Sequence, residues 1–427
     1  MFKSKLKKVI FSFIIINIIF ANIFVVYADD ENEDVTENDV NDISGEITEQ
    51  ILKQTTKQTA ASVSDEPSLN SRIAVAYDRK SGNVIWGKQE NKRTAMASTT
   101  KIMTAIVLLE NSDLNQTITV SAKAAGTGGS RLGLKKNDKI TIRDLLYGLM
   151  LKSGNDSAVA IAETVGGSVE GFAEMMNAKA KELGLENTHY VTPHGLDNPE
   201  HYTTAYELAK LADYALKNDT FAKVVNTKNY TVTINGYPKN ISNTNELLGY
   251  LDGVNGVKTG FTNNAGRCLV TSVNRNNFEI ITVVLQADTK KFRTADSIKL
   301  IEYVYKNYEL LNIKEIVDEK FVKWCEINKN RITINKCKNN NMNLYISNLK
   351  NDIIPVKKED IDEVDIEINN LFYFEAPVEK DTIIGSLKVV LEGEIIDVIE
   401  VKNSNIVEKK DVLDYIKIFP FVLNGNL

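Results

Sequence analysis

The stretch VNGVKTGFTNNAGRCLVTSVNRNNFEIITVVLQAD, residues 254–288, decides the fold class. It contains three runs in which apolar and polar residues alternate, at 256–262, 266–275 and 278–288. Asparagine-rich breaks at 263–264 and 274–277 separate these runs. Alternation with a period of two is typical of β-strands, and such breaks are typical of turns. The sequence therefore predicts three successive strands.

The segments before and after these strands complete a mixed fold. Residues 72–89 alternate in the same way on both sides of a turn at 78–83, which predicts an early hairpin. Apolar residues recur at spacings of three and four in six further segments, 101–110, 142–151, 157–165, 169–183, 204–218 and 296–308. We therefore predict an α+β fold for 71–311, with an antiparallel sheet flanked by helices that the first hairpin completes.

The chain changes character beyond about residue 312. Short alternating runs without helical period predict a separate, small all-β C-terminal domain over 312–404. The last segment, 405–427, is apolar but too short to span a bilayer and is interrupted by Pro420. It is a candidate membrane-surface anchor, and packing against the β domain is the alternative.

The N-terminus has the sequence pattern of a targeting signal. Lys3, Lys5, Lys7 and Lys8 precede a long apolar run that ends in a small residue, Ala28. This pattern predicts a signal peptide over 1–28, with an uncleaved membrane anchor as the alternative. Either interpretation places the rest of the chain outside the cytoplasm.

Charge is concentrated in the next segment. Residues 29–70 hold an excess of ten negative charges, whereas 71–427 is neutral. An acidic run of low hydrophobicity predicts a disordered tether. Because the folded part has no basic surplus, nucleic acid is excluded as a partner.

The three cysteines do not form a disulfide framework or a CxxC zinc motif. Cys268 lies in a predicted strand, where packing is its expected role. Cys325 and Cys337 are a candidate pair in an oxidising compartment, and two free thiols are the alternative.

Ser98 and Lys101 stand three residues apart where an apolar helix is predicted to begin. The lysine would lie on the same helix face as the serine, one turn further on. A buried lysine can take the proton of a serine hydroxyl and make it a nucleophile. The spacing alone is weak, because it recurs at Ser4 and Ser347, and a simple N-cap role for Ser98 is the alternative.

Two further motifs stand between helices and on a strand. Ser153 and Asn155 flank a glycine between two predicted helices, where a loop with an N-cap is the alternative. Lys258, Thr259 and Gly260 lie on a predicted strand, where glycine allows a ligand to approach the strand edge. A protective lysine on an edge strand is the alternative there.

In this order, S-x-x-K, S-x-N and K-T-G resemble the signature of the penicillin-interacting serine acyltransferases. The surrounding stretches resemble one branch, the D-alanyl-D-alanine carboxypeptidases among the low-molecular-weight penicillin-binding proteins. The matching stretches include ASTTKIMTA, TIRDLLYGLMLKSGNDSAVAIAE, PHGLDNPEHYTTAYELAKLADYAL, VNGVKTGFTNNAGRCLVTS and APVEKDTIIGSLKVV. The resemblance covers about 71–400 and implies a β-lactamase/transpeptidase-like fold.

The resemblance also implies roles for individual residues. Ser98 would be acylated, Lys101 would be its base and Ser153 would relay protons. The substrate-binding residues would be Asn155, Lys258, Thr259, Gly260, Phe261 and Arg293. The backbone N–H groups of Ser98 and Phe261 would form the oxyanion hole. A basic residue that some members carry upstream of K-T-G is replaced here by the sequence NTN, residues 243–245, which leaves peptide preference open.

The implied reaction removes the terminal D-alanine from peptidoglycan stem peptides ending in D-Ala-D-Ala. It proceeds through an acyl-enzyme on Ser98 and needs no metal or organic cofactor. β-Lactam antibiotics would acylate the same serine and act as covalent inhibitors. The membrane surface would be a further partner, contacted through residues 405–427.

Three other functions are weighed against this one. A serine β-lactamase shares the three motifs, but the E-x-x-L-N loop of its class A form is missing. A zinc carboxypeptidase would use His189, His194 and His201, whose spacing fits no zinc motif. A non-catalytic wall-binding protein would require a degenerate site, whereas every residue that the mechanism needs is present.

Overall fold

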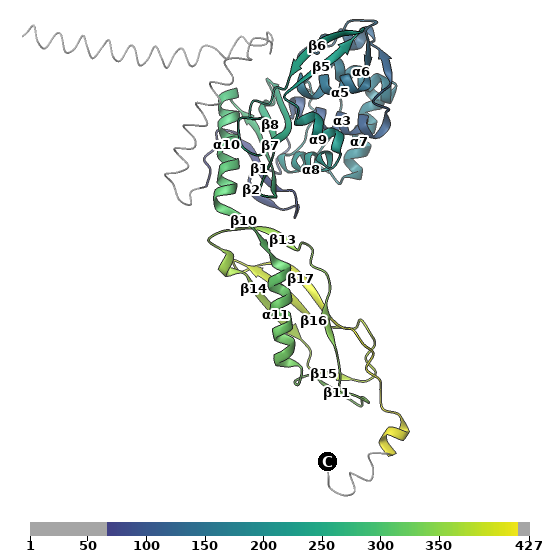
Figure 1. Ribbon diagram of the computed structural model, residues 1–427, viewed down its shortest axis with the longest axis vertical. Coiled ribbons are helices and arrows are strands. Elements are labelled where there is room, and N and C mark those ends of the chain that lie inside the picture. Colours follow the sequence, from purple (N-terminus) through teal and green to yellow (C-terminus); the bar gives the residue numbers. More distant parts are fainter. Residues whose placement is uncertain (1–65, 417–427) are drawn as a thin grey trace, which may run out of the picture. The chain divides into compact units, whose positions relative to one another are not determined.

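The computed structural model describes residues 66–416. They form two compact units, one that ends at Tyr303 and one that begins at Val304, with the turn 80–83 grouped with the second. The predicted signal peptide, most of the acidic tether and the end of the C-terminal segment lie outside the described residues. Figure 1 shows the elements of both units, which are described separately below.

The first unit contains a five-stranded antiparallel sheet in the order β2-β1-β9-β8-β7. The strands are β1 (Ile73–Asp78), β2 (Val84–Lys88), β7 (Val254–Thr262), β8 (Gly266–Arg275) and β9 (Phe278–Ala287). The early hairpin joins the late strands through β1, whose Ile73 lies opposite Leu285 of β9. The three strands predicted over 254–288 and their partnership with the first hairpin are therefore confirmed.

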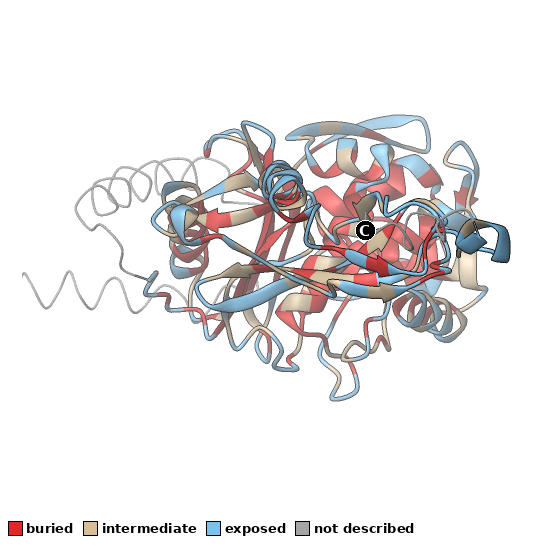
Figure 2. Ribbon diagram, turned by 90° about the horizontal axis from the view of Figure 1, so that it is seen from below, coloured by how far each residue is buried: buried red, intermediate tan, exposed pale blue. Residues whose placement is uncertain are grey.

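Helices make up most of the remaining first unit. They are α3 (Lys101–Asn111), α4 (Ala122–Ala125), α5 (Ile142–Leu151), α6 (Asn155–Gly166), α7 (Val169–Glu182), α8 (Ala205–Leu216), α9 (Asp219–Val225) and α10 (Lys290–Asn307). The predicted helix at 296–308 starts six residues earlier, at Lys290. Apolar residues of the helices and of the sheet form one continuous core, and the buried residues are drawn in red in Figure 2.

Two small two-stranded sheets accompany the helices. β3 (Thr117–Thr119) pairs with β4 (Lys139–Thr141), and β5 (Asn229–Ile234) pairs with β6 (Tyr237–Ser242). The second hairpin turns at Asn235 and Gly236, which both have positive φ, as this tight turn requires. This hairpin was not predicted, although its Asn-Gly turn is visible in the sequence.

The second unit begins with β10 (Tyr308–Asn312) and α11 (Ile313–Asn328). The expectation that no helix occurs beyond about 312 is wrong at this point. Ile313, Val317 and Phe321 are buried at a spacing of four residues, which is the period of a helix face. Asn312 caps the helix by accepting a hydrogen bond from the backbone N–H of Glu315.

β-Strands form the rest of the second unit. They are β11 (Thr333–Asn335), β12 (Leu344–Ile346), β13 (Ile353–Lys357), β14 (Asp365–Asn370), β15 (Tyr373–Glu375), β16 (Ile383–Leu391) and β17 (Glu394–Asn403). The largest sheet has the order β12-β17-β16-β14, and α11 packs on its inner side chains in a core of its own. Cys325 and Cys337 are free thiols.

Each unit contains one of the two tryptophans of the chain. Trp86 lies on β2, opposite Ala76 of β1. Trp324 lies on α11, with its ring 6.1 Å from that of Phe372.

Candidate active site

Ser98 and Lys101 meet where the chain enters α3. Ser98 lies in a short 3-10 turn, Ala97–Thr100, and α3 begins at Lys101. Lys101 Nζ lies 2.8 Å from Ser98 Oγ, and the lysine side chain is fully buried. Thr100 and not Ser98 occupies the N-cap position of α3, so the capping interpretation of Ser98 is wrong. The arrangement places a weak nucleophile beside a potential base.

Two further oxygen atoms hold the Lys101 ammonium. Asn155 Oδ1 accepts from Nζ at 2.8 Å and the carbonyl oxygen of His194 at 3.0 Å. Both are neutral, as is the Ser98 hydroxyl. The Asn155 amide nitrogen donates in turn to the carbonyl oxygen of Gly128 at 2.8 Å. The structure thus brings Ser98, Lys101 and Asn155 together.

Ser153 lies between α5 and α6 in a left-handed conformation, with φ of 57°. Its side chain is buried, and within the described residues its hydroxyl has no hydrogen-bond partner. A buried unpaired hydroxyl is costly in a finished core and is common where a substrate or a transferred proton completes the bonding. Asn155, two residues further on, connects this turn to Lys101.

The strand β7 brings the third motif to the nucleophile. A Cβ placed on Gly260 would lie 3.1 Å from the backbone nitrogen of Ser98, which is tighter than an ordinary contact, so glycine favours this close approach of the strand. Lys258 and Thr259 are buried on the same strand, and Thr259 Oγ1 lies 2.7 Å from Thr244 Oγ1. Phe261 is exposed, with the Arg267 guanidinium 3.7 Å above its ring.

Arg293 lies in the first turn of α10 and is almost fully buried. Its guanidinium forms an ion pair with Glu246, whose carboxylate also accepts from the hydroxyl of Thr294. Sequence reasoning predicted Arg293 as a substrate ligand and missed both Glu246 and Thr244. No local signal identifies Glu246 as the partner of Arg293, because the two residues are 47 positions apart.

The loop 193–201 covers the 3-10 turn of the nucleophile. Thr104 Oγ1 on α3 donates to the carbonyl oxygen of Pro193 at 2.6 Å. Gly195 has φ of 84°, and a Cβ on it would lie only 1.9 Å from the carbonyl oxygen of Ala97. The loop was part of the family resemblance, yet no role was predicted for its backbone, which binds Lys101 through His194.

His201 joins this loop to the nucleophile turn. The backbone N–H of Val191 donates to Nδ1 at 3.0 Å, so the ring proton of the neutral form is on Nε2. Nε2 lies 2.8 Å from Thr100 Oγ1, which donates to the carbonyl oxygen of Ala97 at 2.8 Å. With both ring nitrogens engaged, His201 is unsuited to the zinc site that was weighed as an alternative. Within residues 66–416, no cluster of metal-ligating side chains is present.

The two histidines of this loop are held neutral. Burial lowers the pKa of His194 to about 3, and the charges of Lys101 and His201 add to the effect. Burial also lowers the pKa of His201 to about 4, with a smaller contribution from His189. A cation here would be close to the Lys101 ammonium and poorly solvated.

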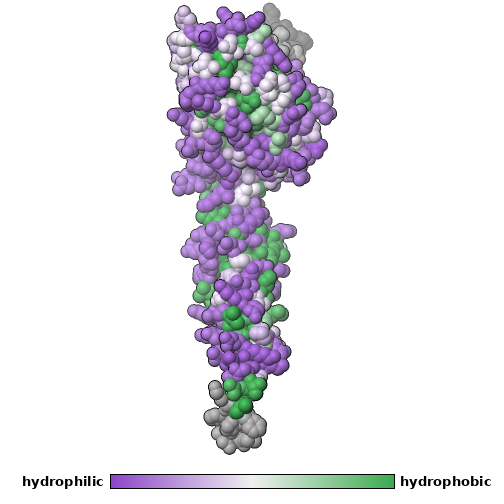
Figure 3. Space-filling model, turned by 90° about the vertical axis from the view of Figure 1, so that its right-hand side faces the viewer, coloured by the Kyte–Doolittle hydropathy of each residue, from purple (hydrophilic) through white to green (hydrophobic). Residues whose placement is uncertain are grey.

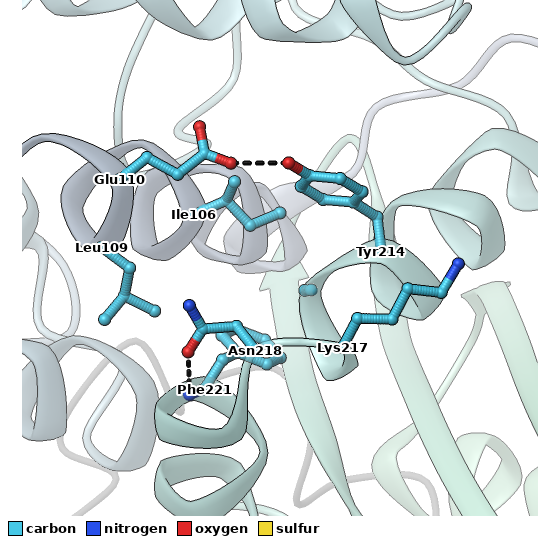
Figure 4. Close-up of a pocket in the computed structure, with 8 residues that line it drawn as sticks. Ile106, Leu109, Glu110, Tyr214, Lys217, Asn218 and Phe221 are labelled. Carbon is cyan, nitrogen blue, oxygen red and sulfur yellow. Dashed lines mark hydrogen bonds between the residues drawn. The ribbon is translucent and has the colours of Figure 1, made fainter.

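A pocket of about 220 Å³ lies at the opposite end of α3 from the nucleophile. Figure 4 shows its lining, in which Glu110 of α3 accepts a hydrogen bond from the Tyr214 hydroxyl and Asn218 caps α9. Apolar side chains such as Ile106 and Phe221 fill much of the remaining wall. None of the predicted site residues lines this pocket.

Comparison with known protein families gives a match over residues 57–289 to the family described as D-alanyl-D-alanine carboxypeptidase. The chain is 34% identical over 342 residues to the D-alanyl-D-alanine carboxypeptidase DacF of Bacillus subtilis, covering 78% of this chain and 85% of that protein. It is 37% identical to the D-alanyl-D-alanine carboxypeptidase of a Streptomyces species, covering 57% of this chain and 90% of that protein.

Solved structures agree with the fold. The carboxypeptidase DacD of Francisella tularensis superposes with a TM-score of 0.65 at 27% identity, covering 82% of this chain and 98% of that one. Penicillin-binding protein 5 of Haemophilus influenzae gives a TM-score of 0.66 at 27% identity, covering 81% of this chain and all of that one. The α+β fold class with its C-terminal β region, the family resemblance and the prediction of a peptidase are thereby confirmed. The chain belongs to the D-alanyl-D-alanine carboxypeptidase family and is a serine carboxypeptidase.

Proposed function

We propose that Ser98 is the acylated nucleophile and Lys101 is its base. One observation carries this assignment, the 2.8 Å contact between the fully buried Lys101 Nζ and Ser98 Oγ. The three oxygen atoms that hold the amine, from Ser98, Asn155 and His194, are uncharged. These contacts hold Nζ beside the hydroxyl whose proton it is proposed to take.

The reaction begins when Ser98 Oγ attacks the carbonyl carbon of the last peptide bond and its proton passes to Lys101. The backbone N–H groups of Ser98 and Phe261 stabilise the tetrahedral oxyanion, to which one such donor contributes about 3–4 kcal/mol. The close approach of Gly260 to the Ser98 nitrogen supports this pairing. The bond to the leaving amine then breaks, and D-alanine departs with the proton.

Ser153 relays that proton from Lys101 to the leaving nitrogen. The buried hydroxyl without a partner supports this role, since it has bonding capacity left for a substrate atom. Water then attacks the ester carbonyl and gives a proton to Lys101, and Lys101 passes this proton to Ser98 Oγ as the ester C–O bond breaks. A β-lactam forms the same ester on Ser98 and keeps its leaving group tethered, which blocks the approach of water.

Substrate binding is assigned to β7 and its neighbours. Lys258 and Thr259 face the terminal carboxylate, Arg293 adds a second cation, and Asn155 binds the acyl carbonyl oxygen. An extended peptide can lie along the uncovered backbone at Gly260. The substrate class is the peptidoglycan stem peptide that ends in D-Ala-D-Ala.

We further propose that residues 1–28 export the chain, that 29–70 is a tether and that 312–404 supports the catalytic domain 71–311. The short helix 412–416 exposes Val412, Leu413, Tyr415 and Ile416, which supports contact of the segment 405–427 with a membrane surface. Figure 3 shows further hydrophobic surface in green. Within residues 66–416, no helix has the length and hydrophobicity to cross a bilayer. Flotation with anionic vesicles, lost on deletion of 405–427, tests the membrane contact.

The catalytic assignment is tested with a short peptide ending in Lys-D-Ala-D-Ala. The protein from residue 29 onward is expected to release D-alanine, and Ser98→Ala is expected to release none. Release by both proteins would move catalysis away from Ser98. Release by neither, with penicillin still bound covalently by the unmodified protein, would indicate a different peptide substrate.

A further inference from the structure

The ion pair between Arg293 and Glu246 is buried in an unusual way. The two side chains are 4% and 6% exposed, and they contact through Arg293 Nη2 and Glu246 Oε1. Glu246 Oε1 also accepts from the Thr294 hydroxyl. The other carboxylate oxygen, Oε2, and the Arg293 Nε are both buried and have no partner within the described residues.

The guanidinium and the carboxylate are therefore joined by only one of the two hydrogen bonds that they can form. A guanidinium and a carboxylate are strongest together when two parallel hydrogen bonds join them. Here one bond is formed, and a buried donor on the arginine is left unsatisfied. A buried donor without a partner is costly, so the present pair leaves part of the hydrogen-bonding capacity of the guanidinium unmet.

The pair lies beside the strand that is proposed to hold the substrate carboxylate. Thr244 contacts the hydroxyl of Thr259, and Asn245 Nδ2 donates to the carbonyl oxygen of Gly256 at 3.0 Å. Glu246 is the next residue in this loop. On the other side, the charge of Arg293 acts on the thiol of Cys268, which lies opposite Gly260 in the sheet.

Glu246 carries its negative charge at neutral pH. Burial alone would raise the pKa of this carboxyl, but the charge of Arg293, the charge of Lys290 and the hydrogen bond from Thr294 outweigh it and lower the pKa. The ionised carboxylate of Glu246 thus pairs with Arg293, the residue that the family resemblance assigns to binding the substrate carboxylate.

We propose that Glu246 is an internal competitor for Arg293. Its carboxylate occupies the guanidinium that the terminal carboxylate of the substrate would engage, and it thereby weakens the preference of the enzyme for acid-terminated peptides. This inference rests on the proposed function, because it assigns the terminal carboxylate to the region of β7. The departure at 243–245 and the adjacent Glu246 together make this loop the specificity-determining segment.

The test compares two peptides that differ only at the C-terminus, one ending in D-Ala-D-Ala and one ending in D-Ala-D-alaninamide. Glu246→Gln is expected to raise the ratio of kcat/KM for acid over amide about five- to tenfold, because a neutral partner binds the guanidinium less strongly. The gain should appear in KM for the acid. Arg293→Ala should lower the ratio without abolishing it, because Lys258 and Thr259 remain, and Glu246→Gln should then leave the ratio unchanged.

Asp213→Asn is the matched control. Asp213 forms another buried carboxylate–arginine pair, in which its carboxylate lies 3.0 Å from the Arg79 guanidinium. It is not one of the residues that we propose to bind the substrate. This variant is expected to lose stability and keep the acid-to-amide ratio. If Glu246→Gln does not fold, Glu246→Asp keeps the charge on a shorter side chain, and a smaller rise of the ratio is then expected.

An unchanged ratio in a folded, active Glu246→Gln enzyme overturns the inference and leaves the pair a structural one. A lower ratio also overturns it, since Glu246 would then position Arg293 for the substrate. If the unmodified enzyme cleaves neither peptide, the proposed function fails separately. The inference is then decided by acylation rates with benzylpenicillin and its methyl ester, where the same rise in acid preference supports it and an unchanged preference overturns it.

Discussion

At the scale of single residues, His201 links two segments that are about a hundred positions apart in the chain. Its neutral ring accepts from the N–H of Val191 and contacts Thr100 in the nucleophile turn. Protonation would give Nδ1 a hydrogen that faces an N–H donor, so the charged ring loses this hydrogen bond. The lowered pKa of His201 is consistent with this geometry.

His201 therefore makes stability dependent on pH. Above about pH 6.5 the ring is neutral in the folded and unfolded states, and below it the unfolded chain binds the proton first. Stability should fall as the pH drops from about 6.5 to about 4, the pKa of the folded state. Between pH 7 and pH 5 this one group should cost about 2 kcal/mol of the free energy of unfolding.

The check is urea unfolding of the unmodified protein and of His201→Gln at pH 7 and pH 5. The variant is expected to be less stable at pH 7, because Thr100 and Val191 lose a well-placed partner. Its further loss on going to pH 5 should be smaller by about 2 kcal/mol. Equal losses in both proteins would show that His201 does not titrate in this range.

At the scale of elements, the loop 193–201 packs closely against the 3-10 turn Ala97–Thr100. The loop presents Gly195 to the Ala97 carbonyl and the His194 carbonyl to Lys101. The turn itself contains a residue with positive φ, Ala97 at 47°. A strained turn of this kind persists when its neighbours hold it in place.

Gly195→Ala is expected to disturb this contact. The new Cβ would lie 1.9 Å from a backbone oxygen, so the loop or the nucleophile turn must move. The rate of covalent labelling by a fluorescent penicillin should fall at least tenfold, because catalysis depends on the placement of Ser98. The labelling rate is measured by gel fluorescence over time.

Gly184→Ala provides the control, since Gly184 also has positive φ, 66°, but a Cβ there meets no atom within 4 Å. It should lose about 1–2 kcal/mol of stability from backbone strain alone and should label at the normal rate. Normal labelling of Gly195→Ala would mean that the loop does not support the nucleophile.

Some elements could be predicted from the sequence and others were missed. The helix at 142–151 was predicted with the same ends as the observed α5, because its polar caps and apolar face give consistent local signals. The S-x-x-K spacing likewise predicted the contact between Ser98 and Lys101. Helix α11 and the hairpin of β5 and β6 were missed, although their signals are local.

The pair Arg293–Glu246 is different, since its partners are 47 positions apart and meet only through the packing of α10 against the loop after β6. No periodicity or capping pattern encodes such a contact. The same holds for His201 and Thr100. Local spacing therefore predicted the contact of Ser98 with Lys101, whereas the tertiary contacts of Glu246 with Arg293 and of His201 with Thr100 were missed.

At the scale of the whole molecule, the two units have separate hydrophobic cores. The solved transpeptidase structure from a Streptomyces species is covered completely by 57% of this chain, with a TM-score of 0.55. A fold equivalent to the first unit thus exists without a counterpart of the second.

The fragment 66–307 is accordingly expected to fold and to release D-alanine. Its kcat/KM for a soluble peptide should stay within about threefold of the full chain, because domains with their own cores are often independent folding units. The fragment carrying Ser98→Ala is the control and should be inactive. A fragment that is soluble and folded by circular dichroism but does not label with penicillin would contradict independence of the units.

The position of Trp86 on β2 and of Trp324 on α11 offers one more possibility. Replacing either indole by phenylalanine leaves a single tryptophan, and the emission of that tryptophan reports on one of the two units. Two emission traces recorded during heating can thus reveal whether the halves melt in one step or in two, and an added penicillin should shift only the trace of Trp86.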